Sequence, residues 1–248
     1  MRSLVAASSA GLCALLTLSV LAPTARAQQA SGAVINKLTL DFGFVQTSGN
    51  TQVTTMSLGE RFTRERGRFT LSQAFALVYG EQRDTVNANN LRTTLRGDYK
   101  IDQVFAWFVG GGFDRNVFAG IARRFEEQVG LQAQVFAAVR DTIRLEGGGS
   151  LTQQIAVGGR QTNFPSARSA ISWRHAFTSS SYFNQNLEYA PNLSEHTDWR
   201  VNSESVIVAP LSARIGFKLS YVVRYDNLPE PGFSTTDRLF TTGIQLTY

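Results

Sequence analysis

The sequence predicts an all-β protein: an antiparallel transmembrane β-barrel of about twelve strands, preceded by a cleaved signal peptide. Three observations lead to this prediction: an export signal at the N-terminus, long segments of alternating apolar and polar residues, and connections that alternate between short and long. The composition agrees, because the 248 residues are 43% hydrophobic but only 17% charged. Soluble domains usually carry roughly 25% charged residues.

The first 27 residues have the features of a signal peptide. Arg2 supplies the positive charge, an apolar stretch follows from Leu4 to Leu21, and Ala25-Arg26-Ala27 is a small-residue cleavage site. We therefore expect residues 1–27 to be removed and residues 28–248 to form the barrel domain. The single cysteine, Cys13, would leave with the signal, so the mature chain would have no disulfide and no thiol-based site.

Strands are predicted by period-two alternation. Between Leu91 and Ile101, the even-numbered residues are polar or charged, whereas the odd-numbered ones are mainly apolar. Only a strand separates such a pattern into two faces. After residue 28 no apolar run is long enough for a membrane helix. The strands predicted in this way are 34–46, 52–63, 68–79, 89–100, 104–115, 125–139, 142–153, 166–177, 182–190, 198–208, 211–226 and 237–248.

The connections between these strands alternate in length, as in an outer-membrane barrel with short periplasmic turns and longer external loops. We expect the long loops at 47–51, 80–88, 116–124, 154–165, 191–197 and 227–236. Asp114 ends one strand and Arg123 and Arg124 precede the next, so we expect an ion pair to order that external loop. Asp237 is expected to have a similar role at the last loop.

Aromatic residues on the outward parity gather near both ends of the strands. Near the short turns these are Phe62, Phe69, Tyr99, Phe105, Phe177, Phe183 and Tyr248, and near the long loops Phe44, Tyr79, Phe113, Tyr189, Trp199 and Tyr225. Two belts are typical of a membrane barrel, whereas the alternative, a soluble β-sandwich, requires none. The last strand ends on Tyr248 and resembles a barrel-insertion signal, so outer-membrane lipids and the barrel-assembly machinery are the expected partners.

The inward parity carries more basic than acidic residues. The lumen-lining candidates are Arg92, Arg96, Asp98, Arg144, Glu146, Arg174, Glu188, Glu204, Arg214 and Lys218. Twelve strands leave a narrow lumen. Two alternatives stay open: arginine and glutamate side chains pair across the lumen and fill it, or an arginine-rich wall forms a narrow path that favours small anions.

A catalytic role is not expected. His175 shares the lipid-facing parity of Trp173, and His196 lies in a loop beside Ser194 and Asp198. Adjacent residues rarely form a working triad, so a barrel hydrolase using His196 is the remote alternative. The sequence indicates no cofactor, and no metal because two histidines without a cysteine are a poor ligand set for a transition metal. It indicates no nucleic-acid partner, because removing Arg2 and Arg26, in a segment without acids, lowers the formal net charge from +5 to +3.

Three loop-associated segments resemble the DUF481 family. They are Gly43–Thr51 (GFVQTSGNT), Gly112–Arg124 (GFDRNVFAGIARR) and Asn227–Asp237 (NLPEPGFSTTD). The family includes salt-induced outer-membrane proteins of bacteria, so the resemblance implies an outer-membrane β-barrel of a Gram-negative bacterium with a possible link to salt stress. The chain departs from the family pattern at Pro229-Glu230-Pro231, where a proline pair is expected.

Overall fold

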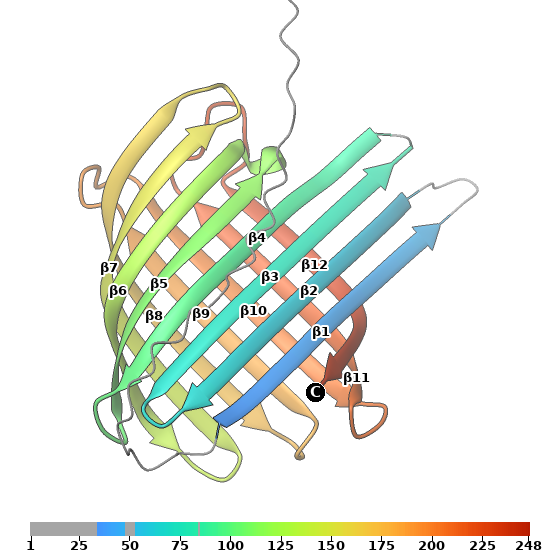
Figure 1. Ribbon diagram of the computed structural model, residues 1–248. Coiled ribbons are helices and arrows are strands. Elements are labelled where there is room, and N and C mark those ends of the chain that lie inside the picture. The colour runs from blue at the N-terminus through green and yellow to red at the C-terminus, as the bar shows by residue number, and fades with distance from the viewer. Residues whose placement is uncertain (1–33, 48–52, 84) are drawn as a thin grey trace, which may run out of the picture. The chain divides into compact units, whose positions relative to one another are not determined.

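The computed structural model describes residues 34–47, 53–83 and 85–248, which form twelve β-strands and one short 3-10 helix (Figure 1). The predicted signal peptide lies outside the described residues. The elements are β1 (Val34–Thr47), β2 (Val53–Arg66), β3 (Phe69–Gln82), β4 (Thr85–Lys100), β5 (Phe105–Asn116), η1 (Val117–Ala119), β6 (Ile121–Ala137), β7 (Asp141–Ala156), β8 (Gln161–Ala176), β9 (Tyr182–Pro191), β10 (Trp199–Pro210), β11 (Ile215–Asp226) and β12 (Thr236–Thr247).

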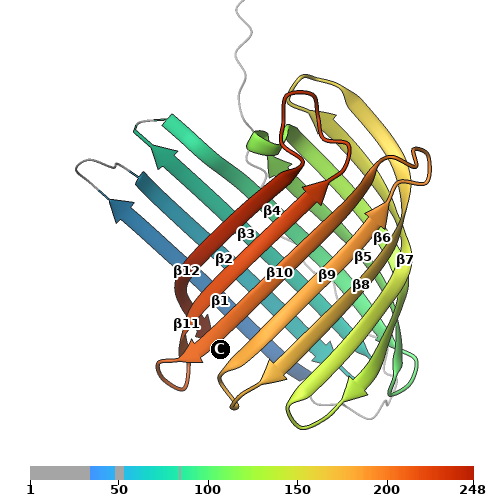
Figure 2. The same cartoon turned by 180° about the vertical axis from the view of Figure 1, so that it is seen from behind.

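The strands form one closed antiparallel barrel. Each strand pairs with its neighbours in the sequence, and β1 pairs with β12 to close the sheet. Figure 2 shows the opposite side, where β8 to β12 continue the same tilted array. Among the described residues no helix is long and apolar enough to cross a membrane. The predicted fold class is therefore confirmed.

Several strands extend further than predicted. The expected long loop at 80–88 is wrong, because β3 continues to Gln82 and β4 begins at Thr85. Strands β6 and β8 also begin earlier, at Ile121 and Gln161. Hydrogen bonding between strands needs no apolar side chain, so pairing continues beyond the apolar band that alternation detects. In contrast β11 begins late, at Ile215, and residues 211–214 form a turn.

The outer face carries the two expected aromatic belts. Near the short turns, the rings of Phe69 and Tyr99 lie 4.9 Å apart between centroids. At the opposite end, Trp199 lies 4.9 Å from Tyr225. Neighbouring rings on adjacent strands thus pack against each other at both ends of the barrel, as aromatic rings do at the two faces of a bilayer.

Polar side chains on the outer face bond to one another. Gln73 on β3 donates to Glu60 on β2 at 2.8 Å, and both share the outward parity of Phe62 and Phe75. An unpaired polar group in hydrocarbon costs several kcal/mol. Mutual hydrogen bonding therefore lowers the cost of placing these two groups in the membrane.

Glycines make room for one aromatic ring inside the barrel. Phe108 on β5 points inward and is only 2% exposed. A Cβ atom on Gly130 would lie 2.7 Å from the Phe108 ring, and one on Gly148 would lie 2.8 Å from the Cα atom of Gly130. The glycines of β6 and β7 therefore let the two backbones and the ring pack closely at the centre of the barrel.

Candidate functional site in the barrel lumen

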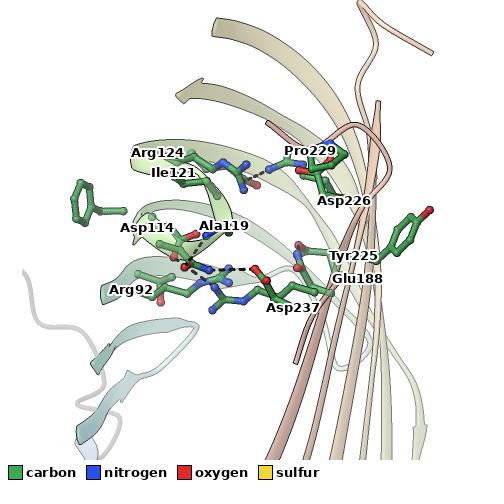
Figure 3. Close-up of a pocket in the computed structure, with 18 of the residues that line it drawn as sticks. Arg92, Asp114, Ala119, Ile121, Arg124, Glu188, Tyr225, Asp226, Pro229 and Asp237 are labelled. Carbon is green, nitrogen blue, oxygen red and sulfur yellow. Dashed lines mark hydrogen bonds and ion pairs between the residues drawn. The ribbon is translucent and has the colours of Figure 1, made fainter. Parts of the chain in front are cut away.

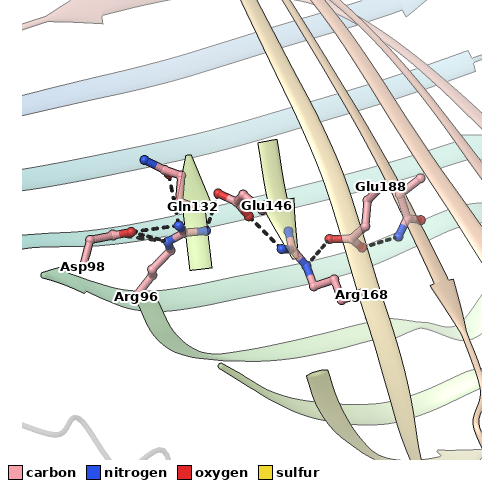
Figure 4. Close-up of polar contacts among 7 residues, drawn as sticks. Arg96, Asp98, Gln132, Glu146, Arg168 and Glu188 are labelled. Atoms are coloured by element: carbon pink, nitrogen blue, oxygen red, sulfur yellow. Dashed lines mark hydrogen bonds and ion pairs between the residues drawn. The ribbon is translucent and has the colours of Figure 1, made fainter. Parts of the chain in front are cut away.

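A row of alternating charges crosses the inner wall from β4 to β10. Arg96 Nη2 lies 2.7 Å from Asp98 Oδ1, and its Nη1 lies 2.8 Å from Glu146 Oε1. Arg168 bonds both Glu146 and Glu188, each at 2.7 Å. Asn202 on β10 donates to Glu188 at 3.0 Å. We call the row Asp98, Arg96, Glu146, Arg168, Glu188 and Asn202 the charge ladder (Figure 4).

The strand register and Phe108 hold the charge ladder in place. Glu146 pairs with Ala170 across β7 and β8, and Glu188 pairs with the same residue across β8 and β9, so all three face the lumen together. The guanidinium carbon of Arg96 lies 4.1 Å from the centre of the Phe108 ring, a cation–π contact. The ladder and this ring fill the part of the lumen next to β4–β9.

The opposite part of the inner wall, formed by β1–β3 and β12, carries small side chains. Its inward residues include Gly43, Gly59, Ala74, Ala76 and Gly243. A cavity of about 670 Å³ lies against them. Across from them the same cavity is bordered by the charge ladder and by inward residues of β8–β11. We call the small-residue wall the hollow side and the wall that carries the ladder and Phe108 the filled side.

Basic side chains dominate this cavity. Nine basic residues line it, against the four inward-facing acids Asp41, Glu146, Glu188 and Glu204, and Glu146 and Glu188 are already engaged in the charge ladder. In the part of the chain that the structure describes, five of the lining cations form no ion pair: Lys37, Arg61, Arg92, Arg144 and Arg174. Lys37 and Arg61 belong to β1 and β2, and the other three belong to β4, β7 and β8, so the cavity as a whole presents uncompensated positive charge.

A second, smaller cavity of about 100 Å³ lies towards the external end (Figure 3). It shares Arg92, Thr94, Glu188, Asn202 and Arg224 with the large cavity, and we call this shared ring the constriction. Arg224 Nη1 lies 3.7 Å from Asp114 Oδ1 there. A solute that crossed the lumen would pass these charged groups.

Above the small cavity, η1 and the loop 227–235 form a cap. Glu230 in that loop is only 7% exposed, and its carboxylate accepts from Arg160 at 2.9 and 3.2 Å and from Gln154 at 3.0 Å. Gly120, with φ of 80°, follows η1, and a Cβ there would meet the Glu230 side chain at 2.8 Å. A glycine is thus required where the loop rests on the end of η1.

Most of the predicted lumen residues face the lumen. Asp98 is in the charge ladder. Arg214 is a correction, because it lies in the turn 211–214, with its guanidinium 5.1 Å from the Tyr248 ring. The strand predicted from residue 211 begins only at Ile215. Arg214 therefore precedes the strand, and the alternation of residues does not place its side chain in the lumen. The residues that line the large cavity as expected are Arg92, Arg96, Arg144, Glu146, Arg174, Glu188, Glu204 and Lys218.

The expected ordering of the η1 loop uses other partners. Asp114 is opposite Arg124 in the register, but its ion pair is with Arg224, and Arg124 donates instead to Gln154. Arg123 is exposed on the outer face. The prediction of an Asp114 pair with Arg123 or Arg124 was wrong because both arginines lie within β6 rather than before it. Asp237 accepts from Asn116 at 3.3 Å, which links the two external loops.

Two central residues were missed by the sequence reasoning. Arg168 joins the two glutamates of the charge ladder. It lies inside the predicted strand 166–177, so its inward parity was available as a signal. Glu230 holds the cap. Its signal was the interruption of the expected proline pair by a charged residue.

The two histidines lie in different surroundings. His175 Nδ1 lies 2.8 Å from Asp141 Oδ1 on the outer wall near the short turns. In the loop of His196, Asp198 accepts from Asn192, and Glu195 accepts from Thr197. The Thr197 hydrogen bonds lower the pKa of Glu195, so its carboxylate is ionised and already engaged. The described residues contain no cluster of three or more potential metal ligands.

The closed barrel, its aromatic belts and its polar lumen define a transmembrane β-barrel of the outer-membrane type. Residues 40–248 match the model of the DUF481 family, described as a protein of unknown function. The chain belongs to that family.

Solved structures share the fold. The NanC porin is 10% identical, with a TM-score of 0.52 over 85% of this chain and 98% of the porin. The COG4313 outer membrane channel from Pseudomonas putida F1 is 9% identical, with a TM-score of 0.50 over 92% of this chain and 99% of the channel. A comparison with curated proteins gave no match. At these identities the likeness establishes the architecture alone.

Proposed function

We propose that the protein is a narrow channel that favours small anions, located in the outer membrane of a Gram-negative bacterium after export and cleavage behind Ala27. The observation that carries this proposal is the set of five lining cations without an ion pair beside a cavity of about 670 Å³. Charged walls in a narrow, low-dielectric passage concentrate the opposite ion. A wall with excess arginine and lysine therefore attracts anions.

The unequal filling of the lumen favours a conducting path over an interior that side chains fill completely. The charges of the ladder neutralise one another, and the small residues of β1–β3 face open space. The shared fold with a porin and an outer membrane channel points in the same direction and favours a channel over an enzyme. A non-conducting structural barrel is the competing proposal, favoured by the cap and the constriction.

Planar-bilayer recording tests the proposal. We expect the purified protein to conduct in a KCl gradient with a reversal potential on the chloride side. The double variant Lys37→Gln/Arg61→Gln should move that potential towards potassium, because both side chains line the cavity. Arg64→Gln is the matched control, since Arg64 is exposed on the outward parity of the same strand as Arg61. Absence of any current would support the structural barrel.

A further inference from the structure

The barrel closes along an unusually short contact. Between β1 and β12 the register covers only Thr39–Phe42 and Ile244–Thr247, with Leu38 and Tyr248 also bonded through their backbones. Across their other edges, β1 is paired with β2 as far as Thr47, and β12 with β11 as far as Thr236. Within the described backbone, residues 43–47 and 236–243 thus have no partner across this contact, and we call these two edges the split seam.

The split seam begins at two glycines. A Cβ on Gly243 would lie 2.9 Å from the Cα of Gly43, so the two backbones still touch there. Just below, Asp41 on β1 forms an ion pair with Lys218 of β11 and accepts a hydrogen bond from Gln245 of β12 at 3.0 Å. The outer ends of β1 and β12 then diverge (Figures 1 and 2). The barrel is fastened at the foot of the seam and unpaired above it.

The inner wall near the split seam carries a strip of three apolar residues among polar neighbours such as Ser57 and Thr241, and apolar residues are unusual in a polar lumen. Val222 on β11 and Leu239 on β12 are opposite each other on the inward parity, and Val78 on β3 faces the same cavity. That cavity also reaches Gly43 and Gly243 at the foot of the seam. A hydrocarbon chain could lie along this strip and remain out of water.

Cations lie at both ends of the apolar strip. Arg224 is two residues beyond Val222 on the same face, and Arg92 is opposite Ala76 in the register. Lys218 lies at the foot, beside Gly243. Lys218 and Arg224 are ion-paired with Asp41 and Asp114, whereas Arg92 forms no ion pair. The strip thus offers one uncompensated cation to a molecule with one hydrocarbon chain and an anionic head.

Because of the cap, the route from the lumen through the split seam is more direct than the route through the external end. Glu230, Arg160 and Gln154 fasten the loop 227–235 over the external end, whereas no backbone hydrogen bond joins the two described edges above the foot of the seam. Open strand edges are costly in hydrocarbon but are tolerated where they border a polar lumen. The external end is thus covered and the side is unfastened.

We propose that the split seam is a lateral exit through which a single-chain amphipathic anion of the fatty-acid class passes between the lumen and the membrane. This inference goes beyond the proposed channel for small anions, because it names a second, larger substrate class and a separate route. The anionic head follows the lumen cations, and the chain leaves past Leu239 into lipid.

Photo-crosslinking with a diazirine-labelled palmitate in lipid vesicles tests the route. We expect adducts on Val78, Val222 and Leu239 inside the barrel, as well as on outer-wall residues such as Leu58. The outer-wall adducts show that the probe has reached the protein. Adducts confined to the outer wall would overturn the proposal. A diazirine-labelled hexadecanol should give fewer inner adducts, and equal inner labelling by the alcohol would overturn the anionic class.

Closing the seam sharpens the test. With Cys13, the chain's single cysteine, replaced by Ala, the pair Phe44→Cys/Thr242→Cys would extend the β1–β12 register by a disulfide at the next outward position. Inner adducts should be lost on oxidation and return on reduction. Leu40→Cys/Leu246→Cys is the matched control, because these residues are already paired and its disulfide should leave inner labelling unchanged. Inner adducts that persist when this disulfide joins β1 and β12 just above the two glycines would contradict a lateral exit there.

Two further measurements keep the outcomes separate. If the disulfide variant does not fold, Val222→Gln/Leu239→Gln should lower the adducts on Val78 while outer-wall adducts remain, and unchanged labelling of Val78 would count against the apolar strip. Chloride current is recorded on the same proteins. Inner adducts on a wild-type protein that carries no current would refute the channel and support the lateral exit. Current without inner adducts would support the channel and refute the lateral exit.

Discussion

The two sides of the lumen are built from the same alternating strands but are filled differently. From β4 to β9, acids and arginines lie within 2.7–2.8 Å of each other around Phe108. Along β1–β3 and β12, five of the inward positions are glycine or alanine beside short polar residues, and the cations Lys37 and Arg61, which form no ion pair, face open space. Alternation therefore determines that a barrel forms, whereas the volume and charge of the inward residues determine whether its interior is solid or hollow.

The largest effect is expected from breaking the filled side. Glu146 bridges Arg96 and Arg168, and its side chain is 15% exposed. Glu146→Ala should lower the free energy of unfolding by about 3 kcal/mol, because two largely desolvated cations lose their partner. Urea unfolding in lipid vesicles measures this loss. Glu127→Gln, at an exposed acid on the outward parity of β6, is the control and should leave the stability unchanged or raised. Equal losses in the two variants would contradict the role of the ladder.

An intermediate effect is expected at the cap. Gly120→Ala should destabilise the resting position of the loop 227–235 by about 1–2 kcal/mol, because a non-glycine residue is strained at positive φ. The added Cβ would also meet Glu230 and Phe233 at 2.8 and 2.9 Å. We expect faster proteolysis of the loop and a larger current. Gly158→Ala is the control, since nothing lies within 4 Å of the added atom. A cap as resistant to protease as in the wild type would refute this reading.

The smallest effect on stability is expected when the hollow side is filled. Ala76→Leu should change the free energy of unfolding by less than about 0.5 kcal/mol, because its side chain enters open space. The channel current should nevertheless fall. Ala106→Leu is the matched substitution on the filled side, where Ala106 is 6% exposed. Overpacking there should cost about 1–3 kcal/mol. Similar unfolding curves for the two variants would abolish the distinction between the sides.

The strands were predictable because alternation is a local property of each segment. The twelve predicted ranges overlap the twelve observed strands, and errors fall at the ends, as for β8 and β11. The choice of charge partners was less accessible, because it depends on register across several strands. Asp114 pairs with Arg224, 110 positions away, rather than with the nearby Arg124. Arg168 and Glu230 were missed for the same reason, since their importance comes from residues on other strands.

The short contact between β1 and β12 also bears on how the molecule assembles. Every other strand pair is a hairpin between sequence neighbours, whereas Asp41 and Gln245 are 204 positions apart. Joining such distant segments carries the largest entropic cost of chain closure of any pairing in the sheet. Few backbone hydrogen bonds then hold the joint, so it should be the last part to form and the first to exchange its amide hydrogens.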